Sequence, residues 1–189
     1  MRQTDEQDRE GPGDGAIVRA VLAGEVERYG VLVRRYRDRY ARYASHLLGS
    51  VELAEDALQD AFVRAYERLS QCRDPDNFAG WFFLILRNRC FAERRRLARR
   101  SPLLEDLGAT LPAPGRTDAA LEHAELRRAV QQALLALTAE QREVFVLRHV
   151  EQLSYDEIAA RTGQTVGALK MRMHRGYDRL RVLLKEHWR

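Results

Sequence analysis

The chain has 189 residues and a formal net charge of +4 at pH 7, a length that allows one domain or two small ones. Its longest apolar block, Trp81 to Leu86, is six residues long, whereas a helix needs about 20 apolar residues to cross a membrane. The N-terminal sequence "MRQTDEQDRE" has no apolar signal core, so neither a secretory leader nor membrane insertion is expected, and a cytoplasmic location is predicted.

The positive charge is concentrated in two separate segments. Residues 81–100 hold seven arginines and one acid, a net charge of +6, and residues 161–189 also have a net charge of +6. Residues 101–125, between them, have a net charge of −4. A solvated basic surface is the simplest explanation of one such run. Two runs on predicted helices favour nucleic-acid binding, because phosphate neutralisation needs clustered Lys and Arg.

Helical periodicity recurs along most of the chain and strand patterns are nearly absent, which predicts an all-α fold. The sequence "GPGDG" at Gly11–Gly15 interrupts this periodicity, so residues 1–15 are predicted to form a disordered acidic tail. Helices are then expected over residues 16–22 and 26–47, and "GSVELAED" starts a third helix that runs to about Leu69.

A turn-rich segment, "SQCRDPDNFAG", separates this third helix from the next one. Asp74 and Pro75, followed by Asp76 and Asn77, are typical of a loop. The helix that begins at Trp81 starts with apolar residues, which are predicted to be buried on all sides, and then becomes strongly basic.

The segment "SPLLEDLGATLPAPGRTD" contains three of the five prolines and breaks the helical pattern again. Residues 101–125 are therefore predicted to be a flexible acidic linker. It joins two small helical domains, residues 16–100 and residues 126–189, each expected to have a modest core of its own.

Capping boxes mark two helix starts in the second domain. Thr138 is followed by Gln141, and Ser154 is followed by Glu157, so that each side chain can satisfy a backbone donor of the other residue. The sequences "SYDEIAART", "GQT" and "VGALKMRMHRGYDRLRVLL" then read as helix, short turn and helix, which predicts a helix-turn-helix. An ordinary helical hairpin with a solvated basic face is the alternative.

The last helix has two chemically different faces. Ala168, Met171 and Arg175 share one face, and small residues followed by bases suit insertion into a major groove, where only slim side chains let the backbone approach. Six apolar residues on the opposite face are predicted to contact the core: Val166, Leu169, Met173, Tyr177, Leu180 and Leu184.

These residues resemble a known family. "LTAEQREVFVLRHVEQLSYDEIAARTGQTVGALKMRMHRGYDRLR" is similar to region four of the extracytoplasmic-function sigma factors, compact bacterial members of the sigma-seventy family. "AEDALQDAFVRAYERL", followed by "FAGWFFLILRNRCFAERRR", is similar to their region two. The resemblance implies a non-enzymatic, dissociable subunit that binds core RNA polymerase, directs it to promoter DNA and helps to melt it. Many members are held inactive by an anti-sigma factor, which the resemblance implies as a further partner.

The resemblance also implies three interfaces. Asn88 would hold an extruded base, the arginines near it would steer phosphates, and the residues of the last helix would read the minus-thirty-five element. The core polymerase-binding residues would be Asp56, Gln59, Asp60 and Phe62. The minus-ten residues would be Cys72, Arg73, Asn77, Trp81, Arg87, Asn88, Arg89, Arg94 and Arg95. The minus-thirty-five residues would be Arg148, Thr165, Gly167, Ala168, Lys170, Met171, Arg172, His174 and Arg175.

Two other classes of protein remain as alternatives. A dimeric operator-binding regulator would also use a helix-turn-helix, but it does not explain the basic helix of the first domain. An enzyme would need a cation site, and no histidine, nucleophile or Gly-rich loop supports one; its candidate ligands are Glu52, Glu55, Asp56 and Asp60. Cys72 and Cys90 match no zinc pattern and are interpreted as plain thiols. No cofactor, metal or small-molecule substrate is predicted.

Overall fold

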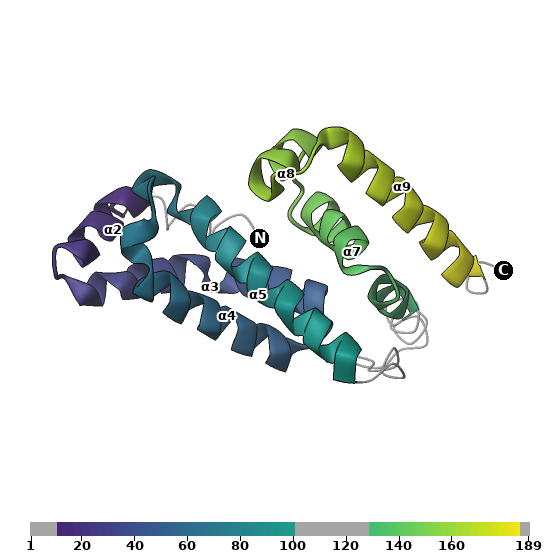
Figure 1. Ribbon diagram of the computed structural model, residues 1–189, viewed down its shortest axis with the longest axis horizontal. Coiled ribbons are helices and arrows are strands. Elements are labelled where there is room, and N and C mark those ends of the chain that lie inside the picture. The colour runs from purple at the N-terminus through teal and green to yellow at the C-terminus, as the bar shows by residue number, and fades with distance from the viewer. Residues whose placement is uncertain (1–10, 101–128, 186–189) are drawn as a thin grey trace, which may run out of the picture.

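The computed structural model describes residues 11–100 and 129–185, and within these ranges every regular element is a helix or a helical turn (Figure 1). The all-α prediction is confirmed. The N-terminal half contains α2 (Asp14–Leu22), the 3₁₀ turn η1 (Val26–Arg28), α3 (Tyr29–Leu48), α4 (Val51–Glu67), the 3₁₀ turns η2 (Leu69–Gln71) and η3 (Pro75–Asn77), and α5 (Phe78–Arg100). The C-terminal half contains a helical segment at 129–135, α7 (Ala139–Phe145), the π-helical turn η4 (Val146–Val150), α8 (Tyr155–Thr162) and α9 (Val166–Leu183).

Three predicted boundaries in the N-terminal half were wrong. Residues 14 and 15 were assigned to a disordered tail, but they begin α2. The Asp14 carboxylate accepts hydrogen bonds from Arg35, at 2.6 Å, and from Tyr36, which fixes this end of the helix. The helix expected from Val26 begins with the 3₁₀ turn η1, and its α-helical part starts only at Tyr29. The helix expected from Trp81 already begins at Phe78. The predicted linker, residues 101–125, and the first ten residues of the predicted tail lie outside the described residues.

Local chemistry explains the tight connection between α3 and α4. Gly49 ends α3 with a φ of 76°, a conformation that favours glycine, and its N–H donates to the Ser45 carbonyl at 2.7 Å. Ser50 then caps α4 by accepting from the Leu53 N–H at 3.2 Å. A side chain at position 49 would also meet Leu135 of the C-terminal half, so the two halves approach closely here.

Aromatic rings fill the centre of the N-terminal half. The Phe62 and Phe82 rings stack with centroids 4.3 Å apart, and the Tyr43 and Phe83 rings meet edge to face at 5.1 Å. The apolar start of α5 was predicted to be buried on all sides. This was wrong, because Leu84 is 41% exposed. One side of α5 therefore faces solvent while the other packs on α3 and α4.

The core does not stop at the end of the N-terminal half. A single cluster of buried residues joins both halves, since α3 packs on α7 and η4 while α5 packs on α8. A small second cluster, formed by Ala133, Leu137 and Leu180, lies wholly in the C-terminal half. The expectation of two separate cores was wrong, because most of the C-terminal core is continuous with the core of the N-terminal half.

No helix in the described parts of the chain combines the length and apolar character needed to span a membrane.

Arg142 connects the two halves, because its guanidinium donates hydrogen bonds to backbone carbonyls of both. Its side chain is 1% exposed and donates to the carbonyls of Leu47, at 2.9 Å, Leu134, at 2.7 Å, and Leu135. The Leu47 carbonyl belongs to the last turn of α3, where helical carbonyls lack intrahelical donors and a cation is favourable. Burial lowers the pKa of the guanidinium to about 9, which still leaves it charged at pH 7.

Replacing this buried guanidinium should destabilise the whole chain. We expect Arg142→Met to lower the free energy of unfolding by about 3 kcal/mol, because three buried carbonyls lose a charged donor. Urea unfolding followed by far-ultraviolet circular dichroism measures this. Arg179→Met is the matched control: Arg179 is exposed and donates only to the Ala136 carbonyl, at 3.1 Å, so its loss should stay below about 1 kcal/mol. Equal losses for both variants would contradict the role of Arg142.

Candidate nucleic-acid interface

The predicted helix-turn-helix is confirmed by its hydrogen bonds. The Ser154 hydroxyl accepts from the Glu157 N–H at 3.2 Å, and the Glu157 carboxylate accepts from the Ser154 N–H at 2.7 Å. Gly163 ends α8 with a φ of 70°. Thr165 then starts α9 by accepting from the Ala168 N–H at 3.2 Å. Two capped helix ends, joined by the three residues 163–165, therefore fix the angle at which α9 leaves α8.

The buried face of α9 matches the predicted one in part, because Val166 and Leu184 are only half-buried and Tyr177 is exposed. Leu169, Met173 and Leu180 are buried as expected, but Tyr177 is 44% exposed. Its hydroxyl lies 2.9 Å from Nε2 of His149. Gly176 is buried instead, and a side chain there would contact Phe145 and Gln141 at ordinary van der Waals distance. Gly176 therefore faces α7, with room left for a methyl group.

The opposite face of α9 is open, as was predicted. Met171 is 56% exposed, although an apolar side chain of this size is usually covered. Gly167 has no heavy atom near the position that a side chain would take. Ala168 and Arg172 are half-buried, and the remaining α9 residues of the predicted set are exposed: Thr165, Gly167, Lys170, Met171, His174 and Arg175.

An aromatic residue that the sequence analysis did not single out joins this basic face. The Arg148 guanidinium lies 5.3 Å from the Tyr155 ring centroid, and the Lys170 ammonium lies 5.9 Å from it. Arg148 also donates to the Leu153 carbonyl at 2.9 Å. Tyr155 thus holds two predicted DNA-binding cations near each other; the only sequence signal for it was an aromatic residue directly after the helix cap.

The predicted minus-ten residues fall into two groups. Arg73, Asn77, Asn88 and Arg95 are exposed. Cys72 is buried, and its thiol donates to the Asp74 carbonyl at 3.4 Å; burial raises the pKa of this thiol. Trp81 is half-buried and its ring lies 5.9 Å from that of Phe78. The structure therefore exposes a polar and basic strip along the 73–77 loop and the outer side of α5.

Three of the predicted phosphate-binding arginines are engaged inside the protein. Arg87 donates to the Glu143 carboxylate from Nε, at 2.5 Å, and from Nη2, at 2.9 Å. Arg89 pairs with Asp60, at 2.5 Å, and with Glu93. Arg94 donates to the Leu47 carbonyl at 3.1 Å. Much of the +6 charge of residues 81–100 is thus balanced by acids and helix ends.

The predicted polymerase-binding residues on α4 do not all face outward. Asp56 and Gln59 are exposed, whereas Asp60 is half-buried between Arg64 and Arg89. Phe62 is 7% exposed and stacks in the core, so its ring is not available to a partner.

A polar cavity of about 290 Å³ lies beside this face of α4, between α4 and α5. Its lining residues include Asp56, Arg89, Glu93 and Arg96. Among residues 11–100 and 129–185, no three histidine, cysteine or acidic side chains converge in a way that could hold a metal ion.

The fold and these surfaces define a helical protein with a helix-turn-helix, and comparisons identify its family. Residues 32–100 match the family model of sigma-70 region 2, and residues 127–180 match that of sigma-70 region 4. The RNA polymerase sigma-E factor of Streptomyces coelicolor is 34% identical over 158 residues, which cover 84% of this chain and 86% of that protein. The chain belongs to the extracytoplasmic-function sigma factors of the sigma-70 family. This is a family of transcription initiation factors and not of enzymes.

Two further relatives agree with this assignment. The ECF RNA polymerase sigma factor SigE of Mycolicibacterium smegmatis is 36% identical over 159 residues, and the aligned part covers 82% of this chain and 61% of that relative. The sigma factor RpoE of Bartonella quintana, solved in complex with the anti-sigma factor NepR, is 28% identical. Its structure superimposes with a TM-score of 0.60 over 81% of this chain and 94% of RpoE.

The start of α9 offers a test that separates folding from charge. Thr165→Ala should lower the free energy of unfolding by about 1 kcal/mol, because the Ala168 N–H loses its acceptor. Thr165→Asp should recover that stability, since aspartate caps as well as threonine and its charge suits the helix N-terminus. Urea unfolding curves of the three proteins measure both effects. A Thr165→Asp variant no more stable than Thr165→Ala would contradict the capping geometry.

Proposed function

We propose that this chain binds core RNA polymerase, brings it to promoter DNA and helps to open that DNA. The observation that carries the proposal is the exposed face of α9, with Lys170, Met171 and Arg175 beside a capped turn, in a chain that matches both sigma-70 regions in order. A dimeric operator-binding regulator is not favoured, because it would leave the region 2 match and the exposed strip on α5 without a role.

The polymerase-binding surface that we propose is narrower than the predicted set. Asp56 and Gln59 are one helical turn apart at most and both are exposed on α4. The Asp60 carboxylate already forms ion pairs with Arg64 and Arg89, and the Phe62 ring belongs to the core. Charge-complementary contacts therefore rest mainly on Asp56, with Gln59 as a neutral hydrogen-bonding partner.

Reversing the charge at this surface should weaken holoenzyme assembly. We expect Asp56→Arg to lower the affinity for core polymerase about tenfold, because an attractive contact becomes a repulsive one. Glu67→Arg makes the same charge change at another exposed position of α4 and should leave the affinity nearly unchanged. Titration of labelled protein with core enzyme measures both, and circular dichroism checks the fold. Equal affinities for the two variants would contradict the assignment.

The minus-thirty-five surface that we propose is the open face of α9. Lys170 and Arg175 supply charge for phosphates or base edges, while the exposed Met171 supplies an apolar contact of the kind that reads a thymine methyl group. Tyr155 orients Lys170 and Arg148 on the same side. Residues near the start of α9 can approach the groove closely, because Gly167 carries no side chain.

Salt dependence can separate the two kinds of contact. Lys170→Ala should weaken binding to all duplexes and reduce the slope of log affinity against log salt by about one. Met171→Ala should leave the slope unchanged and relax the preference at one base pair. Lys185→Ala, which removes the same charge from an exposed position beyond α9, should not alter binding. Fluorescence anisotropy with a promoter-derived duplex, over a range of salt concentrations, measures these effects. An unchanged slope for Lys170→Ala would place that residue outside the interface.

The minus-ten surface that we propose centres on Asn88 and the 73–77 loop. Asn88, Asn77 and Arg73 are exposed and can hold an extruded base, since side-chain amides both donate and accept hydrogen bonds. An anti-sigma factor is a further proposed partner, because the similar RpoE was solved in complex with one.

A cytoplasmic location stays a prediction. It follows from the proposed binding to RNA polymerase.

A further inference from the structure

The loop that carries Arg73 and Asn77 is organised around one backbone carbonyl. The Asp74 carbonyl accepts hydrogen bonds from the Cys72 thiol, at 3.4 Å, and from the Asn77 N–H, at 3.0 Å. Pro75 starts the 3₁₀ turn η3, and its ring fixes the backbone angle φ at this position. The loop therefore has a defined local shape, whereas its place on the helices depends on contacts with residues outside it.

The first turn of α2 supplies such a contact. α2 packs on η3, and the Asp76 carboxylate lies against Gly15, where the atoms of any side chain would overlap with it. The Arg19 guanidinium, one turn further along α2, donates to the same carboxylate at 3.4 Å and 3.5 Å. The N-terminal turn of a helix attracts negative charge. Because Gly15 has no side chain, the carboxylate can come close to that turn.

α2 is itself fixed on α3 at this end. Arg35 donates to the Asp14 carboxylate at 2.6 Å and to the Pro12 carbonyl at 3.1 Å, and the Tyr36 hydroxyl also donates to Asp14. The Asp14 side chain is only 11% exposed. These contacts hold the first turn of α2 in place, so that α2 can act as a rigid support for η3.

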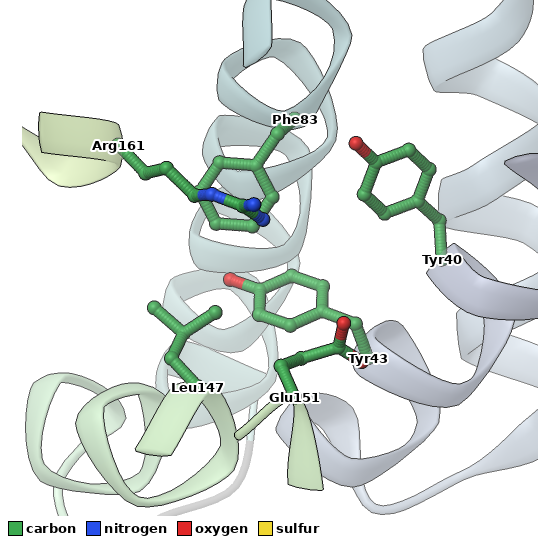
Figure 2. Close-up of a pocket in the computed structure, with 6 residues that line it drawn as sticks. All are labelled: Tyr40, Tyr43, Phe83, Leu147, Glu151 and Arg161. Carbon is green, nitrogen blue, oxygen red and sulfur yellow. The ribbon is translucent and has the colours of Figure 1, made fainter. Parts of the chain in front are cut away.

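The end of the loop is fixed on α5. Figure 2 shows Tyr40 of α3 with its hydroxyl directed toward the helix that carries Phe83. This hydroxyl donates to the Ala79 carbonyl, in the first turn of α5, at 2.8 Å. Oδ1 of Asn77 lies 2.6 Å from the position that a Cβ at Gly80 would take, so the amide is folded back over that turn. α5 therefore places Asn77 on one side, and α2 places the residue before it.

We propose that Gly15 and Arg19 are positioning residues for the base-binding loop. They hold Asp76 on α2, and α2 thereby fixes the direction in which Asn77 meets an extruded base. This inference rests on the proposed function, because it assumes that the 73–77 loop contacts that base. A loop that takes several directions is competent to bind in only a fraction of the molecules, and the apparent affinity for the correct base falls by that fraction.

Adding a methyl group at position 15 tests this in the holoenzyme formed by the full-length chain and core polymerase. The probe is a fluorescein-labelled single-stranded oligonucleotide that the parent holoenzyme selects from a random pool. The readout is the base preference, defined as the ratio of the affinities for the best and the worst base at each position. Gly15→Ala displaces the exposed Asp76 carboxylate and should reduce this ratio about fivefold at one position. The salt dependence of binding should stay the same, since no phosphate contact is lost.

Gly13→Ala is the matched control. It makes the same change at the residue that precedes α2, where no heavy atom lies within 4 Å of the added methyl group, and it should leave the base preference unchanged. Circular dichroism and thermal unfolding check the fold of both variants. Gly15→Ala should not lower the melting temperature, because alanine is favoured over glycine inside a helix. Equal losses of base preference in the two variants would overturn the proposal.

The ion pair with Arg19 is tested by removing and then restoring its charge. Arg19→Met should lower the base preference by a smaller factor than Gly15→Ala, because an exposed ion pair contributes little by itself. Arg19→Lys should restore the preference of the parent, since it keeps the positive charge. An unchanged preference in Arg19→Met would overturn the role of Arg19.

A second background tests whether α2 acts through Asn77. Asn77→Ala removes the amide that α2 positions, so that adding Gly15→Ala should not lower the base preference further. A further loss in this background would mean that Asp76 reads the base itself, and it would overturn the proposal. Should Gly15→Ala fail to fold, Asp76→Ala replaces it: it removes an exposed side chain and should lower the base preference by the same factor.

Asn88→Ala separates this inference from the proposed function. Asn88 is the residue proposed to hold the extruded base, and it does not belong to the loop. A loss of base preference in Asn88→Ala, with full preference in Gly15→Ala and Asp76→Ala, overturns this inference alone. A parent chain that forms no holoenzyme, or whose holoenzyme selects no sequence from the pool, overturns both.

Discussion

The buried carboxylate of Glu143 is the constraint on which the arrangement of the helices depends. It lies on α7, a helix of only seven residues, next to the equally buried Arg142. The two side chains satisfy opposite needs: Glu143 takes donors from α3 and α5, while Arg142 gives donors to the carbonyl ends of α3 and of the 129–135 segment. Because neither charge can be left without partners in the core, α7 can occupy only a narrow range of positions.

The position of α7 in turn fixes the helix-turn-helix. α9 packs on α7 through Gly176, and α8 packs on α5 and on η4. The exposed face of α9, with Lys170 and Met171, therefore has a set direction relative to α5. A buried ion pair gives less stability than apolar residues of the same volume often would. Removing one partner of such a pair is nevertheless costly, because the other charge is left in the core without its partner.

Local features of the chain could be predicted from the sequence, and contacts between distant residues could not. The capping boxes at Thr138 and Ser154 and the turn at Gly163 were predicted because each depends on residues within one helical turn. Helical periodicity placed Tyr177 in the core, but its ring meets Phe145 at the margin of the contact and stays 44% exposed, whereas Gly176 faces α7 and is buried. Periodicity describes one helix and carries no information on how near its neighbour lies.

The candidate site shows the same limit. The exposure of Met171 and Lys170 followed from their place opposite the core face of α9. The pairing of Arg87 with Glu143 joins residues 56 positions apart, and a run of arginines looks equally basic whether or not acids from elsewhere neutralise it. The proline-rich segment before α7 suggested two independent cores, but the apolar faces of α3 and α5 are completed by residues that follow that segment.

The pair of Arg87 and Glu143 should make the two halves one folding unit, and a double-mutant cycle tests this most directly. Urea unfolding of the parent, Arg87→Met, Glu143→Gln and the double variant gives four free energies. Each single variant should lose about 3 kcal/mol, because it leaves the other charge buried without its partner. The double variant should lose no more than either, which corresponds to a coupling energy of about 3 kcal/mol. Losses that add to within about 0.5 kcal/mol would contradict the claim.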